Sequence, residues 1–254
     1  NRRNYLFLAC EPNFLLKNIL YIISCHLADF NICVANHLQY KLINRLMVSK
    51  QKVITIFNGV KPKNIDSGQK HPSGIPLITF TGKLIKRKNV LCLLKALSRI
   101  TLPYKCFIIG YGPEKSRLIK YVAEQKLEAK ISFIPFTPNV EKFLSKTDIF
   151  VLPSLAEGMS MSLLEAMSFG ITCVVSDIDA NKELIKHGKN GLIFSLKKGH
   201  VDLSNKLSLL LNYPELKTSL GKQSLMSIKK IYSANASLNK CSMTYAEIHK
   251  FRGN

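Results

Sequence analysis

The sequence predicts an α/β fold built on a parallel sheet, with helices packed against both faces. Three observations lead to this prediction. Short apolar runs rich in β-branched residues alternate with longer helical patterns, several of these runs have no polar face, and the runs cease after residue 199. Such alternation is typical of βαβ units, and strands that are apolar throughout are expected where helices cover both sides of a sheet.

Strands are expected at residues 30–35, 52–57, 76–82, 105–110, 131–136, 148–154, 171–176 and 191–194. Helices are expected between them at 89–100, 114–126 and 160–169, and three closing helices at 201–212, 214–232 and 236–251. Pro214 suits the first turn of a helix, because a proline there removes no helical hydrogen bond. Residues 14–30 are apolar but interrupted by polar residues, so a buried or membrane-skimming helix is favoured over a span of about 20 residues.

A long connection divides the chain. Residues 57–76 are rich in Gly, Pro, Asn and Ser and are longer than the connections around them. Residues 1–58 are therefore interpreted as the last part of a first α/β domain, and residues 59–254 as a complete second domain. Because the first part holds too few strands for a sheet of its own and the sequence begins with Asn1, the rest of that domain is expected to precede it.

The net charge and the cysteine content limit the classes of function that the chain can have. The 254 residues include 37 Lys and Arg against 16 Asp and Glu, a formal net charge of +21, and the excess peaks in residues 61–150. An anionic membrane surface, a phosphate-bearing substrate, a nucleic acid or a lysine-rich genome would each explain it. No nucleic-acid-binding motif accompanies the charge, so no nucleic-acid partner is expected. Seven scattered cysteines without a C-x-x-C pair indicate buried free thiols in a reducing compartment.

Four loops follow predicted strands and enter predicted helices, which is where open parallel sheets bind ligands. In the first loop, Gly82 ends a strand and is followed by cations. Gly82 would let the backbone approach a ligand, and the cations would face a dianion near the helix start. A solvated basic turn explains the loop equally well. The cations are Lys83, Lys86, Arg87 and Lys88.

The second and third loops carry weaker signals. Gly110-Tyr111-Gly112 resembles a phosphate loop but lacks the third glycine of G-x-G-x-x-G and the ending of a P-loop. A tight turn between strand and helix is an equal alternative. The third loop includes Phe136, which would wall a base pocket or simply belong to the core and turn.

The fourth loop carries two carboxylates, Glu157 and Glu165. On one continuous helix they would be separated by about 12 Å of rise, which exceeds the roughly 5–9.5 Å of a glycosidase pair. Glu157 is therefore placed in the loop, and Glu165 one to two turns into the helix. No His or Asp joins them at ligand spacing, so a metal site is not expected. A structural role alone stays open. The backbone N–H groups that would point outward as an anion site belong to Met159, Ser160 and Met161.

Taken together, these motifs resemble the nucleotide-sugar half of family 4 glycosyltransferases of the GT-B fold. The resemblance extends over about residues 27–230. It rests on "KVITIFNGVKP", similar to the interdomain linker, "FTGKLIKRKNVLCLLKAL", "FIIGYGPEKSRL", and a signature block that begins "VLPSLAEGMSMSLLEAMSFG". The resemblance implies a complete C-terminal Rossmann-like domain, preceded by the last part of an N-terminal Rossmann-like domain.

The resemblance also implies a role for each loop. Lys83 and Lys88 would bind the donor diphosphate and neutralise the leaving group as the glycosidic bond breaks, with Arg87 sharing that role. Glu157 would hold hydroxyls of the transferred sugar at the catalytic centre, and Glu165 would hold the ribose hydroxyls. The other substrate-binding positions that it implies are Gly82, Gly110, Gly112, Phe136, Gly158, Met159, Ser160 and Met161.

The implied reaction moves a sugar from a UDP- or GDP-linked donor to a glycan or lipid-linked acceptor, with retention of configuration, in surface polysaccharide biosynthesis. No metal or other cofactor is implied, because protein cations replace the metal. A cytoplasmic location is expected, peripheral on the anionic inner face of the membrane. Two alternatives are a non-catalytic donor-binding half that needs a partner chain or the missing domain, and a nucleotide-sugar epimerase of the same fold. His26 and His37 are the histidines on the first-domain side, and neither lies in the family's acceptor-side context.

Overall fold

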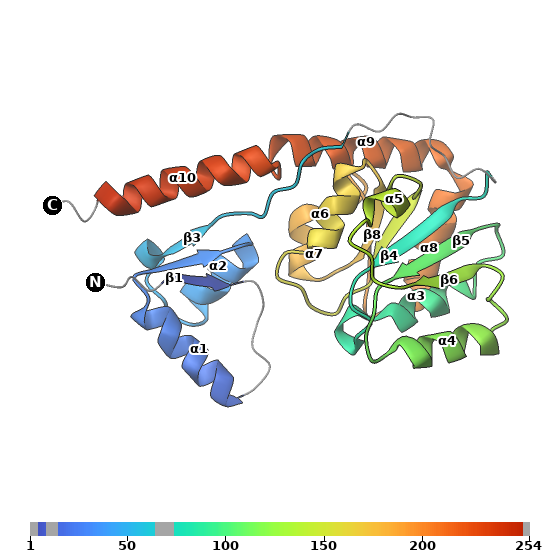
Figure 1. Cartoon of the computed structure of the whole chain (residues 1–254), viewed down its shortest axis with the longest axis horizontal. Helices are drawn as coiled ribbons and strands as arrows, with labels where there is room; N and C mark the ends of the chain where they lie inside the picture. Colours follow the sequence, from blue (N-terminus) through green and yellow to red (C-terminus); the bar gives the residue numbers. More distant parts are fainter. Residues whose placement is uncertain (1–4, 9–14, 64–73, 251–254) are drawn as a thin grey trace.

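The computed structural model describes residues 5–8, 15–63 and 74–250, and these residues form two parallel sheets (Figure 1). The sheet of the three-stranded unit has the order β1-β2-β3. The sheet of the six-stranded unit has the order β6-β5-β4-β7-β8-β9. Every pairing between these strands is parallel. This arrangement confirms the predicted α/β class.

The three-stranded unit contains helices and strands in alternation. Its elements are β1 (Tyr5–Leu8), α1 (Leu15–Leu27), β2 (Phe30–Cys33), α2 (Asn36–Asn44), the 3-10 turn η1 (Lys50–Lys52) and β3 (Val53–Thr55). The sequence did not predict β1. In the described part of α1, the apolar side chains that remain exposed are Ile19, Leu20, Ile23 and Leu27.

The six-stranded unit holds the larger core. Its first half is β4 (Leu77–Thr81), η2 (Lys86–Lys88), α3 (Val90–Leu97), β5 (Lys105–Ile109), α4 (Lys115–Glu124) and β6 (Ile131–Ile134). Its second half is α5 (Glu141–Leu144), β7 (Ile149–Leu152), α6 (Met161–Ser168), β8 (Thr172–Ser176), α7 (Asp179–Leu184), β9 (Leu192–Phe194), α8 (His200–Asn212) and α9 (Pro214–Lys230).

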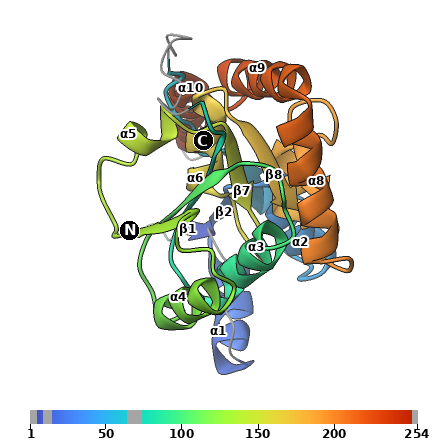
Figure 2. The same cartoon turned by 90° about the vertical axis from the view of Figure 1, so that its right-hand side faces the viewer.

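The central strands of this sheet are buried along their whole length, which explains why they lack a polar face. Every residue of β4, β7 and β8 is buried. Helix α3 packs with α4 and α8, and α6 packs with α9, so that helices surround the sheet (Figure 2). All eight strands that the sequence predicts are present, each within two residues of the expected start and three of the expected end.

Two chain segments cross between the units and lie side by side. The segment after β3 meets the junction between α9 and α10 (Ala234–Lys250), where the N–H of Val60 donates to the carbonyl of Tyr232 at 3.0 Å and the N–H of Ala234 donates to the carbonyl of Val60 at 3.0 Å. A Cβ on Gly59 would lie 2.5 Å from the carbonyl oxygen of Ser233, so the close approach requires a glycine. Residues 64–73 of the predicted connection lie outside the described residues.

Helix α10 continues from the crossing and runs toward the three-stranded unit (Figure 1). The Ser237 hydroxyl donates to the carbonyl of Phe57 at 2.8 Å. Further along, Thr244 and Glu247 line a hollow of about 580 Å³ together with residues of β2, η1 and β3. The predicted boundary at residue 58 assigns α10 to the second domain, while its contacts are with the first sheet. Both ends of the described chain therefore contribute to the three-stranded unit.

The sequence also predicts that the cysteines are buried free thiols and that the apolar residues 14–30 form a helix. Among the described residues six cysteines are free, and five of these are buried: Cys25, Cys33, Cys92, Cys106 and Cys173. Cys10 lies outside the described residues. No helix among the described residues has both the length and the apolar character needed to cross a bilayer.

Candidate active site

The strand order predicts a ligand crevice beside the two loops that carry the predicted site. In the sheet, β4 and β7 are neighbours, and the chain moves outward from them in opposite directions. At such a switch point the loops at the carboxyl ends of the two strands diverge and leave room for a ligand. The loop after β4 carries Gly82, Lys83, Arg87 and Lys88, and the loop after β7 carries Glu157.

An ion pair joins these two loops. The Nζ atom of Lys88 lies 2.5 Å from Oε1 of Glu157, although the two residues are 69 positions apart in the sequence. Their side chains are only 14% and 7% exposed. A second contact joins the same two loops, since the N–H of Leu155 donates to the carbonyl of Arg87 at 2.8 Å. The loops after β4 and β7 are therefore held together at the crevice.

The cations of the first loop separate into different environments. Lys83 and Lys86 are exposed, whereas Arg87 and Lys88 are partly buried. The guanidinium of Arg87 donates to the carbonyl of Ala156 at 3.4 Å. Gly82 has φ +151°, and a Cβ there would lie 3.8 Å from Cε of Lys88, so the lysine passes close over the glycine.

Gly110 and Gly112 have a structural requirement that does not involve a ligand. Both have positive φ, +147° and +152°. A Cβ on Gly110 would lie 1.9 Å from the carbonyl oxygen of Gly82, and one on Gly112 would lie 2.3 Å from that of Leu84. The glycines thus allow the second loop to pack directly against the first. Their predicted contact with substrate stays a prediction.

Two exposed aromatic side chains stand beside this loop pair. Tyr111 and Phe136 are 54% and 67% exposed, and their rings meet edge to face with centroids 5.9 Å apart. This contact between the two rings joins the second and third predicted loops. A flat base could stack on such a surface, because aromatic faces attract other rings.

Glu157 and Glu165 occupy different environments, as their sequence context predicts. Glu157 lies in the loop before α6, and Glu165 lies inside that helix. Ser160 caps the helix, with its Oγ accepting a hydrogen bond from the N–H of Leu163 at 3.4 Å. Gly158, Met159 and Ser160 are buried, and Met161 is 42% exposed.

Glu165 lines a pocket of about 300 Å³ between α6, the β6–α5 loop and the crossing segment. Burial raises the pKa of the Glu165 carboxyl, the negative charge of Glu141 raises it further, and Lys63 opposes both. Nζ of Lys63 lies 2.5 Å from Oε1 of Glu141, so the positive and the negative charge beside Glu165 largely offset one another. Sequence reasoning missed Lys63 and Glu141, because neither belongs to a recognisable motif.

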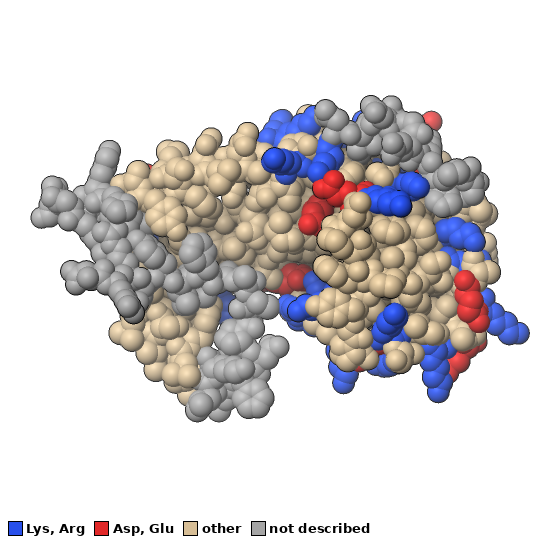
Figure 3. All heavy atoms as spheres, in the orientation of Figure 1, with Lys and Arg blue, Asp and Glu red and all other residues tan. Residues whose placement is uncertain are grey.

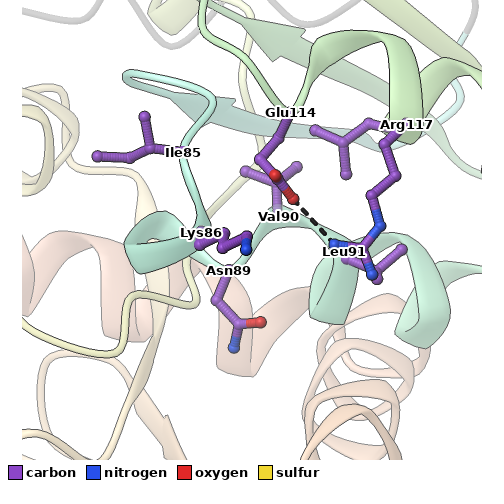
Figure 4. A pocket seen from close by; sticks show the side chains of 8 residues that line it. Ile85, Lys86, Asn89, Val90, Leu91, Glu114 and Arg117 are labelled. Carbon is purple, nitrogen blue, oxygen red and sulfur yellow. Dashed lines mark hydrogen bonds and ion pairs between the residues drawn. The ribbon is translucent and has the colours of Figure 1, made fainter.

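A different pocket, of about 190 Å³, lies on the outer side of the first loop (Figure 4). Lys86 and Asn89 come from that loop, and Glu114 and Arg117 from the start of α4, where they face one another at 3.1 Å. Lys86 is one of the cations that the sequence indicates, and no other predicted site residue lines this pocket. Among the described residues, no group of three or more His, Cys, Asp or Glu side chains is arranged to hold a metal ion.

Charge is unevenly distributed over the visible surface. In Figure 3 the basic side chains that can be seen lie mainly over the six-stranded unit. This unit includes most of residues 61–150, where the basic excess peaks. An anionic ligand would therefore meet a favourable field on approaching this unit.

Residues 62–225 match the family described as "Glycosyl transferases group 1". This match covers well over half of the chain. The chain belongs to the group 1 glycosyltransferases. It has the GT-B fold, as the comparison with solved structures also shows. The crystal structure of HepE from Anabaena in complex with UDP superimposes with a TM-score of 0.86 at 16% identity, over 97% of this chain and 72% of that chain. A glycosyltransferase from Rickettsia africae superimposes with a TM-score of 0.84 at 17% identity, over 97% and 70%.

Two bacterial proteins that the chain resembles are named as galactosyltransferases. An Escherichia coli UDP-Gal:alpha-D-GlcNAc-diphosphoundecaprenol alpha-1,3-galactosyltransferase is 30% identical over 181 residues, 65% of this chain and 47% of the relative. The lipopolysaccharide 1,6-galactosyltransferase of Salmonella typhimurium is 25% identical over 72% of this chain and 53% of the relative. The chain of this glycosyltransferase thus spans about half the length of these curated relatives.

Proposed function

We propose that this glycosyltransferase binds a nucleotide-diphosphate-sugar, with UDP as the nucleotide, at the crevice between the loops after β4 and β7. The observation that carries the proposal is the largely buried Lys88–Glu157 pair at the switch point of the sheet. A cation that is already desolvated and held by a carboxylate is suited to bind a diphosphate, because its charge acts in a medium of low polarity. UDP is favoured over GDP by the UDP-linked donor named for the Escherichia coli relative.

Each side chain has one task in the proposed reaction. Lys88 and Lys83 bind the diphosphate, and they stabilise the negative charge that stays on it when the bond to the sugar breaks. Glu157 accepts hydrogen bonds from the sugar hydroxyls, and Glu165 accepts them from the ribose. The sugar carbon then forms its bond to the acceptor oxygen on the same face from which the diphosphate departs. The configuration at that carbon is therefore retained, as is typical of family 4. No divalent metal is needed where lysines supply the positive charge.

The proposed acceptor is a glycan or a lipid-linked precursor of a surface polysaccharide, as in the two bacterial relatives. The proposed location is cytoplasmic, on the inner face of the membrane. Two features support it: the net charge of +21 and the exposed apolar side chains Ile19, Leu20, Ile23 and Leu27 on α1. Flotation with vesicles that contain anionic lipid tests the membrane contact, and binding that does not depend on anionic lipid contradicts it.

A thermal-shift screen of UDP, GDP and their sugar conjugates, in EDTA, tests the donor proposal. A ligand at 100 times its Kd stabilises the folded state by about 2.7 kcal/mol. For a chain of this size we expect the melting temperature to rise by roughly 5–10 °C with UDP. A K88M variant should lose this rise. If no nucleotide shifts the melting temperature, or if K88M responds like the wild type, the proposed donor site is wrong.

A non-catalytic donor-binding half is the second candidate function, because every side chain assigned to the donor lies in the six-stranded unit. Such a chain would bind UDP-sugar and transfer nothing by itself. Transfer of a radiolabelled sugar to a lipid-linked acceptor by the chain alone would exclude it. Transfer that begins only when a second polypeptide is added would support it.

A further inference from the structure

Glu183 connects the two units at the first turn of α2. One of its carboxylate oxygens, Oε1, accepts a hydrogen bond from the N–H of Asn36 at 2.6 Å. The other, Oε2, accepts from the N–H of His37 at 3.3 Å and lies 3.0 Å from Nδ1 of the same residue. Glu183 belongs to α7 of the six-stranded unit, 147 positions away from Asn36.

This carboxylate takes the place of an N-cap. The N-cap residue of α2 is Ala35, whose side chain has no acceptor. The first N–H groups of a helix need an acceptor, and a negative charge is favoured there by the helix dipole. Helix α2 obtains both from the other unit. The side chains of His37 and Glu183 are only 20% and 13% exposed, so the contact is largely shielded from water.

The electrostatics of Glu183 agree with this geometry. Burial by itself would raise the pKa of the carboxyl. The hydrogen bonds from the His37 side chain and from the backbone N–H groups of Asn36 and His37 outweigh burial, and the pKa of Glu183 lies below its ordinary value. The carboxylate therefore stays charged where it meets α2.

The contact adjoins the crossing segments, since the Tyr232 hydroxyl donates to the backbone carbonyl of Glu183 at 3.3 Å. Two neighbouring sets of contacts therefore join the units. One is the crossing at Val60 and Ser233. The other is α7, which faces α2 across the gap between the units (Figure 1). The crossing by itself would let the units rotate about it, whereas the added contact between the Glu183 carboxylate and α2 restrains their relative orientation.

Helix α7 is also tied to the loop that carries Glu157. Nδ2 of Asn181 donates to the carbonyl and the hydroxyl of Ser176 at 3.1 and 3.0 Å. The Ser176 hydroxyl in turn donates to the carbonyl of Ser154 at 2.5 Å, and all three residues are buried. Ser154 lies three positions before Glu157 in the loop after β7. The helix that holds α2 thus also supports the loop at the crevice.

We propose that Glu183 is an interdomain latch: held by the α2 N-terminus and His37, it fixes the three-stranded unit over the crevice of the six-stranded unit. The latch is a property of the two units and needs no assumption about the reaction. Its consequence for transfer rests on the proposed function, because an acceptor held by the three-stranded unit must be brought to a donor in the crevice. Glu183 is a positioning residue and not a catalytic one.

Hydrogen exchange of the Asn36 and His37 amides tests the latch in the full chain. In an E183A variant we expect these two amides to exchange roughly 5- to 30-fold faster, the change that loss of an N-cap produces. The amides of β4 and β7 should exchange as in the wild type. Small-angle scattering should show a broader distribution of interatomic distances, which the loss of a cap within one rigid body would not produce.

The matched control is D179N, which removes an exposed carboxylate from the first turn of the same helix. Its exchange rates and scattering should equal those of the wild type. If E183A fails to fold, H37A removes the side-chain partner from the opposite unit and should still speed exchange at position 36. Rates within twofold of the wild type in the folded variant, or an unchanged scattering profile, would overturn the proposal. Neither measurement needs a nucleotide, so failure of the donor proposal leaves the test intact.

Discussion

The Lys88–Glu157 pair predicts opposite effects on nucleotide binding for its two members. At an N–O distance of 2.5 Å the gross attraction is about 7 kcal/mol for an effective dielectric constant of 20. Desolvation offsets most of this, because both side chains are largely buried. Glu157 therefore competes with a diphosphate for Lys88. Once the competing charge is removed, the lysine is free to bind the ligand.

The perturbation is E157Q, which removes the charge and keeps the size of the side chain. We expect the affinity for UDP to be unchanged or up to roughly tenfold higher, since tenfold corresponds to about 1.4 kcal/mol. We expect K88M to lose a charge-assisted hydrogen bond of about 1.5–3 kcal/mol and to bind UDP roughly 10- to 150-fold more weakly. With UDP-sugar, E157Q should lose the preference for the conjugate over UDP, because Glu157 holds the sugar hydroxyls.

Calorimetric titration of UDP and UDP-sugar in EDTA measures all of these affinities. Urea unfolding supplies the control for stability. Each single variant leaves one charge without its partner, so each is expected to cost about 3 kcal/mol, and the double variant K88M/E157Q less than their sum. Equal loss of UDP affinity in E157Q and K88M would refute the reasoning, because it would show that Glu157 supports the lysine and does not compete for it.

Three further predictions concern other parts of the molecule. E165A should weaken UDP binding in calorimetry by roughly tenfold or more, since the ribose loses its carboxylate acceptor; unchanged affinity contradicts the ribose assignment. G110A should lower the stability by about 3 kcal/mol or more in urea unfolding, because its Cβ would lie 1.9 Å from the Gly82 carbonyl oxygen. The control G188A, at φ +72° with open space around it, should cost only about 1 kcal/mol. Finally, because the pKa of Glu183 is depressed, its contribution to stability should be present above the ordinary carboxyl pKa and be lost as pH falls through the lowered one. The stability difference between wild type and E183Q should therefore shrink below about pH 4, and a difference that is constant with pH would contradict this.

The sequence contains enough information to predict the six-stranded unit, because its strands are recognisable one by one. The runs of β4, β7 and β8 are buried on both faces, and this burial is written directly in their apolar composition. Three short elements, α5, α7 and β1, were not predicted. Helices α5 and α7 have only four and six residues, too few for a helical period to show. Strand β1 is a run of four residues that depends on its pairing with β2.

For the site, too, the sequence predicts local features but not the contacts between distant residues. The loop positions of Lys88 and Glu157 follow from the strands before them, but their ion pair joins residues 69 positions apart. The contact of Glu183 with α2 spans 147 positions, and the sequence does not indicate that these residues meet. Such contacts are decided by how the two units pack, and no local pattern of residues encodes that packing.

The path of α10 has a consequence for how this protein is made. The first sheet is translated before the six-stranded unit, whereas α10, which lines the hollow beside β3 and bonds to Phe57, is translated after it. A ribosome must synthesise the whole six-stranded unit before α10 emerges to complete the contacts of the first sheet. The β3 side of the first sheet therefore stays uncovered until residues 234–250 have been synthesised.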